Sequence, residues 1–397
     1  MGSNGIRDRV AIVGMGCTPF GEHWDKGVDD LLVDAAREAV ADAGMAIGDV
    51  DAFWLGTMGN QSGLTLSRPL QLENKPVTRL ENFCATGSEA FRNACYAVAS
   101  GAYDRAMAIG VEKLKDSGFS GLVIGGAPTD GTQAELTAPA MFSLLVPAYA
   151  KKYGVTEDEL KDVMTRIAWK NHENGAKNPR AQFRKAVPKE TIACSPLVAG
   201  SLGIFDCSGV SDGSAAALVV RAEDAHRYTD RPLYVKGLSF VAGAARGASD
   251  NTYDYTTFPE VVASAEDAYR QAGITNPRSE LALAEVHDCF TPTELVLMED
   301  LGFAERGMGW KDVLAGTFDL DGELPVNPDG GLKSFGHPVG ASGLRMLFEA
   351  WLQLRGKAGD RQITTHKKLA LTHNLGGWPG GCVSFVSITG TELSSGG

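Results

Sequence analysis

The sequence lacks the features of several large classes of protein. Its longest stretch without an acidic or basic residue, 369–391, is interrupted by His373, Asn374, Pro379 and several glycines, so we expect no membrane-spanning helix. Residues 1–9 are polar and contain no apolar core of a secretion signal. Basic residues are outnumbered, with 37 Lys and Arg against 49 Asp and Glu, which argues against general nucleic-acid binding. One local basic patch would still suffice for an anionic ligand.

Cysteine is scarce and shows no pairing pattern. The chain has seven cysteines and no C-x-x-C pair, which argues against a zinc ribbon or an iron–sulfur cluster. An odd number in a chain of this size predicts free thiols in a reducing cytoplasm. The glycines after the first strand do not complete a dinucleotide fingerprint, because Pro19 stands at the third glycine position. Individual cysteines are therefore candidates for chemistry.

The pattern of apolar residues alternates between the strand and helix periods, which predicts layers of α/β structure. Strands are expected at 10–14, 50–55, 80–83, 106–111, 233–240, 281–286 and 368–372, and helices at 29–43, 85–100, 260–272 and 339–354. The second half repeats the order of the first, and similar text (Asp-Ala-Gly-Met, Gln-Ala-Gly-Ile) ends the first helix of each half. We infer an internal duplication of roughly 200 residues per copy.

Residues of about 115–200 fit neither copy and contain a basic window. Between 151 and 190 there are ten Lys or Arg and six Asp or Glu, in a chain of net charge -12. A solvated helical surface is one interpretation of this window. The other is an anion-binding insertion suited to a phosphorylated ligand.

Cys84 lies between a short expected strand and a helix rich in small residues, in Asn-Phe-Cys-Ala-Thr-Gly-Ser. The helix N-terminus favours a thiolate at this position, so we predict a nucleophile. A buried structural cysteine is the alternative.

A second motif, His287-Asp-Cys289-Phe, follows directly after an expected strand. Side chains at the carboxyl end of a strand commonly line α/β active sites, so we expect catalytic residues here. Zinc ligands are an alternative, but no nearby set completes four ligands.

His337 stands in a glycine-dense turn, 330–343, just before a helix. A lone histidine is usually structural, whereas this setting favours a functional one. If the duplication holds, His337 occupies in copy two the position of Cys84 in copy one, and both face one pocket. In the final glycine-rich motif, Asn374 ends a strand, and strand alternation predicts Cys382 as a buried structural residue.

Taken together, these motifs resemble the thiolase superfamily over nearly the whole chain. The resemblance rests on the duplicated halves, the insertion, the Cys84 segment, Gly-His-Pro-x-Gly-Ala-Ser-Gly at 336–343 and the final Asn-x-Gly-Gly. His-Asp-Cys-Phe at 287–290 is similar to the sterol-carrier-protein-type and archaeal branch. In commoner thiolases a C-x-G-G motif near the end supplies the acid/base cysteine, and Asn374 stands in its place here.

This resemblance implies a thiolase fold, with duplicated βαβαβαββ halves in five αβαβα layers and an inserted loop domain. It implies an N-terminal core at 1–115 plus 200–230, a CoA-binding loop domain at 116–199 and a C-terminal core at 231–397. It also implies a homodimer or dimer of dimers. Some relatives work with a separate zinc-ribbon/OB-fold acyl-CoA-binding protein, and the sequence leaves that partner open.

The implied reaction is cleavage of a 3-oxoacyl-CoA by CoA, or the reverse Claisen condensation, with no metal or redox cofactor. The family roles are Cys84 as nucleophile, Cys289 as acid/base, His337 as activator of Cys84 and oxyanion donor, His287 as oxyanion donor, and Asn374 as a supporting residue. Arg180, Arg184 and Lys185 are the expected contacts to CoA phosphates, since they cluster in the basic window.

Two other functions remain open. A retro-aldolase acting on a β-hydroxyacyl-CoA would need no acyl-enzyme, so the presence of Cys84 argues against it. A non-catalytic acyl-CoA- or lipid-binding subunit would need none of Cys84, Cys289 and His337.

Overall fold

A computed structural model describes residues 5–59, 62–116 and 137–394 of the chain. The first half alternates strands and helices, and its last strand follows a long insertion. Its elements are β1 (Val10–Cys17), α1 (Val28–Asp42), β2 (Ala52–Gly56), α2 (Leu64–Leu70), β3 (Val77–Leu80), α3 (Thr86–Ala99), β4 (Arg105–Glu112) and β7 (Gly213–Arg221).

The second half repeats this order with extra short helices. Its elements are β8 (Leu233–Ala242), α8 (Pro259–Ala272), α9 (Pro277–Glu280), β9 (Leu281–Glu285), α10 (Thr291–Asp300), α11 (Gly309–Ala315), α12 (Gly331–Ser334), α13 (Ser342–Leu354), β10 (Leu369–Trp378) and β11 (Gly381–Gly390). Short 3₁₀ turns cover Ile47–Asp49, Ile204–Asp206, Ala222–Arg227, Arg246–Ala248 and Gly359–Arg361.

Strand order confirms the duplication. The first half runs β3-β2-β4-β7-β1 across its sheet and the second runs β9-β10-β11-β8. In each half the first strand pairs antiparallel with the last, the last pairs antiparallel with the strand before it, and that strand pairs parallel with its other neighbour. The counterpart of β3 in the second half is reduced to one parallel bridge, between Ala284 and Val326.

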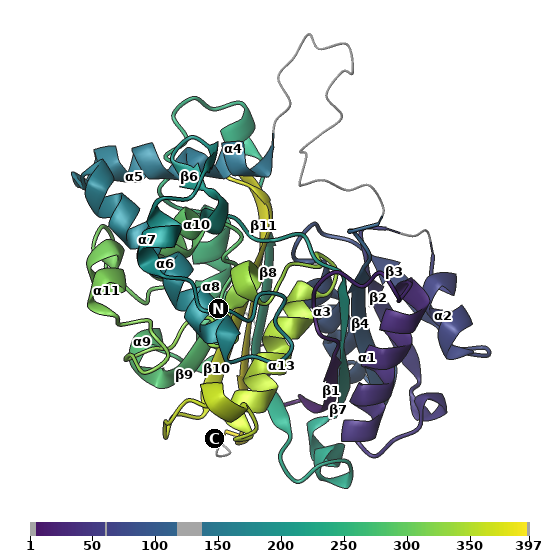
Figure 1. Cartoon of the computed structure of the whole chain (residues 1–397). Helices are drawn as coiled ribbons and strands as arrows, with labels where there is room; N and C mark the ends of the chain where they lie inside the picture. The colour runs from purple at the N-terminus through teal and green to yellow at the C-terminus, as the bar shows by residue number, and fades with distance from the viewer. Residues whose placement is uncertain (1–4, 60–61, 117–136, 395–397) are drawn as a thin grey trace.

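The elements form the five αβαβα layers that the family resemblance implied. Helix α1 packs on β1 and β7, and α8 packs on β8 and β11. Figure 1 shows α3 and α13 between the two halves, where they contact each other. The strands of the two halves join in one continuous nine-stranded sheet, because β1 pairs with β8 at Ala11–Tyr234 and Ile12–Leu233.

Glycines allow the central layer to close tightly. A Cβ atom at Gly87 of α3 would lie 2.6 Å from the carbonyl oxygen of Gly340, and a Cβ atom at Gly110 of β4 would overlap the same oxygen. Helix α3, strand β4 and the loop before α13 therefore meet backbone to backbone. This approach brings the N-terminal ends of α3 and α13 to the centre of the molecule.

The insertion packs mainly on the second half. Its elements are α4 (Ala138–Ser143), α5 (Leu145–Tyr153), α6 (Glu157–Ala176), α7 (Lys189–Ala193), β5 (Leu197–Ala199) and β6 (Leu202–Gly203). Helix α6 contacts α10, α11 and α12. Part of the predicted loop domain 116–199, residues 117–136, lies outside the described residues. No helix in the described part of the chain combines the length and apolarity needed to cross a bilayer.

Three predicted strand ends were wrong. Strand β3 ends at Leu80 instead of residue 83, β10 continues past Asn374 to Trp378, and β1 continues past residue 14 to Cys17. The second error has a clear cause: Gly376 and Gly377 form ladder pairs with Val383 and Cys382, so the hairpin with β11 overrides the local tendency of glycine to end a strand.

Candidate active site

Cys84 lies in the tight connection between β3 and α3. The preceding residue, Phe83, has a φ of 49°, which is uncommon for a residue other than glycine, and thereby turns the chain sharply toward the helix. Desolvation raises the pKa of the Cys84 thiol to about 12, and the nearby Glu81 and Glu112 raise it as well. The thiolate expected from the helix N-terminus is therefore wrong for the resting site, and Cys84 needs a base to ionise it.

His337 is placed to be that base. Its Nδ1 lies 2.7 Å from the hydroxyl of Ser342, and this hydroxyl donates to the carbonyl oxygen of Pro338 at 3.0 Å. Because the hydroxyl hydrogen is used in that bond, Ser342 must accept from Nδ1–H. The lone pair is then on Nε2, which is buried and has no hydrogen-bond partner in the described structure. Burial lowers the pKa of His337 to about 3, so its imidazole is neutral.

His287 offers the site an N–H donor, whereas His337 offers a bare ring nitrogen. The hydroxyl of Ser88 in α3 donates to Asn374 Oδ1 at 2.6 Å, which orients the amide so that Nδ2 donates to His287 Nδ1 at 3.2 Å. His287 therefore carries its proton on Nε2 and offers an N–H donor. Burial lowers its pKa well below the ordinary value, which keeps this ring neutral too. The two histidine rings lie 5.4 Å apart, centroid to centroid.

Cys289 is buried beside these groups at the start of α10. Its thiol lies 3.7 Å from the hydroxyl of Thr293, and its backbone oxygen accepts from the N–H of Ser208 at 2.9 Å. Burial raises the pKa of Cys289 well above the ordinary value, and the neighbouring Cys84 thiol raises it as well. The two cysteines thus share one buried environment.

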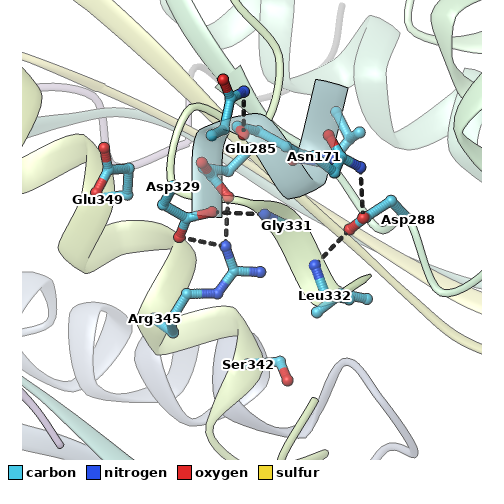
Figure 2. Close-up of polar contacts among 12 residues, drawn as sticks. Asn171, Glu285, Asp288, Asp329, Gly331, Leu332, Ser342, Arg345 and Glu349 are labelled. Carbon is cyan, nitrogen blue, oxygen red and sulfur yellow. Dashed lines mark hydrogen bonds and ion pairs between the residues drawn. The ribbon is translucent and has the colours of Figure 1, made fainter. Parts of the chain in front are cut away.

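Asp288 holds this segment to the glycine-rich turn. Its carboxylate accepts from the backbone N–H of Leu332 at 2.6 Å and from Nδ2 of Asn171 at 2.8 Å, as Figure 2 shows. Burial raises the pKa of Asp288 to about 6. The sequence grouped Asp288 with the catalytic candidates, and the structure gives it a positioning contact between two loops.

A buried ion cluster fixes α13 to the same turn. Arg345 of α13 is fully buried and its Nη1 bonds both Glu285 and Asp329. Figure 2 shows the guanidinium between these carboxylates, and the N–H of Gly331 donates to Asp329 Oδ1 at 2.8 Å. Removing one member of such a cluster leaves an uncompensated buried charge, so the turn that carries His337 is held firmly.

The site also contains a cluster with metal-ligand chemistry. Ligand atoms of Cys84, His287 and His337 all lie within 4.8 Å of one another. Metal-bound imidazole normally donates its second N–H to an acceptor, as His337 does to Ser342. At His287 the second nitrogen accepts from Asn374, so its metal-facing nitrogen carries a proton. The tautomer therefore fits an N–H donor better than a metal ligand.

The structure brings five predicted residues together: Cys84, Cys289, His287, His337 and Asn374. Cys382 is buried in β11, and its thiol lies 3.4 Å from a carboxylate oxygen of Glu260, as expected for a structural cysteine.

The three predicted phosphate contacts are separate from this cluster. Arg180 pairs with Glu38 at 2.6 Å, so its charge is already compensated. Arg184 and Lys185 are exposed and have no carboxylate partner in the described residues. Arg180 and Arg184 line a cavity of about 780 Å³ to which none of the five clustered residues belongs.

Sequence reasoning missed the roles of Ser88 and Ser342. Both lie inside the quoted motifs, so their positions were visible. Their partners were not, because Ser88 bonds Asn374 across 286 positions of sequence.

Comparisons with known proteins identify the family of the chain. Residues 10–223 match the family model described as "Thiolase, N-terminal domain", and residues 244–389 match "Thiolase C-terminal domain-like". An acetyl-CoA acetyltransferase of Methanothermobacter thermautotrophicus is 37% identical over 94% of this chain and 98% of its own. Human sterol carrier protein 2 is 31% identical over 93% of this chain and 70% of its own. The solved "Ltp2-ChsH2(DUF35) aldolase" superposes with a TM-score of 0.82 at 24% identity, covering 98% of this chain and 100% of that one.

Proposed function

The chain belongs to the thiolase family and is an acyltransferase of that type, and on this premise we propose that it cleaves 3-oxoacyl-CoA esters with CoA, or runs the reverse condensation, through an acyl group on Cys84. One observation carries the proposal. Beside the protonated thiol of Cys84, His337 offers an Nε2 without a proton and His287 offers an N–H group. A base for the nucleophile and a donor for the oxyanion are the two groups that acyl transfer needs.

The first half-reaction uses the two histidines differently. His337 Nε2 takes the thiol proton of Cys84, and the thiolate attacks the 3-oxo carbon of the substrate. The oxyanion accepts from His287 Nε2–H and from the newly formed His337 Nε2–H. Cleavage of the C2–C3 bond leaves the acyl group on Cys84, and the enolate of the shorter CoA ester takes a proton from the Cys289 thiol. An oxyanion donor contributes about 3–4 kcal/mol to such a step.

The second half-reaction restores the site. The Cys289 thiolate removes the proton of the CoA thiol, and the CoA sulfur attacks the acyl carbon on Cys84. The Cys84 thiolate leaves and recovers its proton from His337. Both cysteines end as thiols, which agrees with the raised pKa of each.

Trapping the acyl-enzyme tests the proposal. Acetyl-CoA should add one acetyl mass to the Cys84 peptide of the native protein and none to that of Cys84→Ala, and Cys84→Ala should lose turnover. Cys194→Ala is the matched control, because Cys194 is an exposed free cysteine. A fully active Cys84→Ala protein would end the proposal.

One neighbour suggests a second function. The fold is also that of the "Ltp2-ChsH2(DUF35) aldolase", so a retro-aldolase that works with a DUF35-type partner is the alternative. Retro-aldol cleavage forms no acyl-enzyme, so turnover of a 3-hydroxyacyl-CoA without acetylation of Cys84 would favour it. Absence of both activities would favour a non-catalytic acyl-CoA-binding subunit.

We further propose that CoA docks on the insertion, through Arg184 and Lys185, and that the chain forms at least a dimer. The net positive window 151–190 and the uncompensated charge of these two side chains support the docking. Light scattering of the purified protein tests the dimer, and the mass of a monomer would exclude it.

A further inference from the structure

Lys333 of α12 is a buried cation with an unusual surrounding. Only 1% of its surface is exposed, and its ammonium donates to the backbone oxygen of Asp206 at 2.6 Å. No carboxylate within the described residues lies in ion-pair distance of it. An isolated buried charge is strongly unfavourable, so such a lysine calls for an anion nearby.

The other buried cations show what Lys333 lacks. Lys170 pairs with Glu294 at 2.6 Å. The same holds for each remaining Lys or Arg counted as buried in the described structure, namely Lys236 with Asp8, Arg345 with Glu285 and Asp329, Arg355 with Asp42, and Arg361 with Glu349. The missing carboxylate is therefore a local feature of Lys333 and not a habit of this fold.

The backbone places Lys333 beside Cys289. Its ammonium contacts the segment 206–208, and this segment runs alongside 289–290, with Ser208 N–H donating to Cys289 O and a bridge between Cys207 and Phe290. The backbone N–H of Lys333 donates to a carboxylate oxygen of Asp288 at 3.3 Å. Lys333 is thus bonded directly to Asp288, and it is linked through Asp206 to the segment that bridges Phe290.

The charged and titratable groups around the Cys289 thiol include Cys84, Asp288 and Lys333, which act on its pKa, and the clustered His287 and His337. Lys333 lowers the pKa of Cys289, whereas Cys84 and Asp288 raise it, in an environment whose burial raises it most. Asp288 is an incomplete counter-ion for Lys333, because its carboxylate accepts three N–H groups and none belongs to the ammonium.

We propose that Lys333 is a positioning residue whose charge stabilises the thiolate that Cys289 forms during the reaction, which makes that thiol a usable acid/base. The inference deepens the proposed function and rests on the acid/base role given there to Cys289. In the proposed reaction, Lys333 transfers no proton. It stabilises the Cys289 thiolate that remains after Cys289 has protonated the enolate. This stabilisation lasts until the CoA thiol gives its proton to Cys289.

Alkylation of Cys289 by iodoacetamide, followed at its peptide by mass spectrometry from pH 6 to 10, tests the idea without turnover. At an effective dielectric of about 20, a unit charge within about 8 Å changes ionisation more than tenfold. Lys333→Met should therefore lower the alkylation rate at pH 7 at least tenfold. Lys333→Gln is a second neutral variant that can still donate to Asp206. Lys333→Arg keeps the charge and should stay within about threefold of the native rate.

The matched control is Lys236→Met, because Lys236 is also buried and also donates to a backbone oxygen, that of Glu392, at 2.8 Å. It should not change alkylation of Cys289. In the neutral Lys333 variants, exchange of the acetyl-CoA methyl hydrogens with solvent should fall with alkylation and recover at higher pH, while acetylation of Cys84 persists.

Native-like alkylation of Cys289 in both neutral variants would overturn the inference. A native protein that never acetylates Cys84 would instead refute the proposed function, and the alkylation result would then stand by itself.

Discussion

Replacing Ser342 by alanine isolates the tautomer of His337 as a catalytic requirement. The hydroxyl of Ser342 is the acceptor that holds the imidazole proton on Nδ1, at 2.7 Å. Without it, the reactive tautomer has a buried N–H with no partner, and the other tautomer places its proton toward Cys84. We therefore expect slower acylation of Cys84 in a site whose side chains are otherwise intact.

The size of the effect follows from the burial of both residues. An unsatisfied buried N–H costs about 1–3 kcal/mol, which corresponds to a rate loss of about five- to 150-fold. Because burial holds the pKa of His337 at about 3, the ring is neutral across the working range. The loss should thus be the same at pH 6 and pH 8.

Rapid mixing with acetyl-CoA, acid quenching and mass analysis of the Cys84 peptide give the rate of acylation. Ser264→Ala is the control, since Ser264 is equally buried and its hydroxyl lies 2.7 Å from that of Ser384, in α8 and β11. It should leave acylation unchanged. Acylation of Ser342→Ala within twofold of the native rate would refute the assignment of the tautomer.

Three further predictions concern other parts of the chain. Cys289→Ala should abolish solvent exchange of the acetyl-CoA methyl hydrogens and Cys382→Ala should not, because only Cys289 lies in the cluster; greater damage from the Cys382 change would reverse the assignment. Neutralising Arg184 and Lys185 together should raise KM for the CoA substrate with little change in kcat, and should reduce the salt dependence of binding; an unchanged KM would place the phosphate site elsewhere. Burial raises the pKa of Glu112 to about 7 from 4.5, so its ionisation destabilises the fold as pH rises between these values. Glu112→Gln should therefore increase the free energy of unfolding by about 3 kcal/mol above pH 7.5 and by less than about 1 kcal/mol at pH 5, and an equal gain in melting temperature at both pH values would count against this.

The layered fold could be predicted from the sequence because its signals are local. A continuous apolar run identifies β1 and the period of 3.6 residues identifies α1 and α8 without knowledge of their partners, and the repeated order reveals the duplication. Motif text identified Cys84, His287, Cys289 and His337 for the same reason. The end of β10 was missed because it depends on pairing with β11. The counterpart of β3 in the second half was not predicted, because it consists of a single bridge and has no strand pattern of its own.

The chemical state of the site was decided by tertiary structure alone. The sequence placed Cys84 at a helix start and predicted a thiolate, but enclosure by distant segments desolvates the thiol and raises its pKa to about 12. The tautomer of His337 depends on Ser342, and that of His287 depends on the Ser88–Asn374 pair. Lys333 has no ion-pair partner among the described residues because the packing of α12 places no carboxylate within ion-pair distance of its ammonium. Residue order therefore determined which groups are present and which elements carry them. Their protonation was settled by close packing, because desolvation and hydrogen bonding act over a few ångströms of space and are indifferent to separation along the chain.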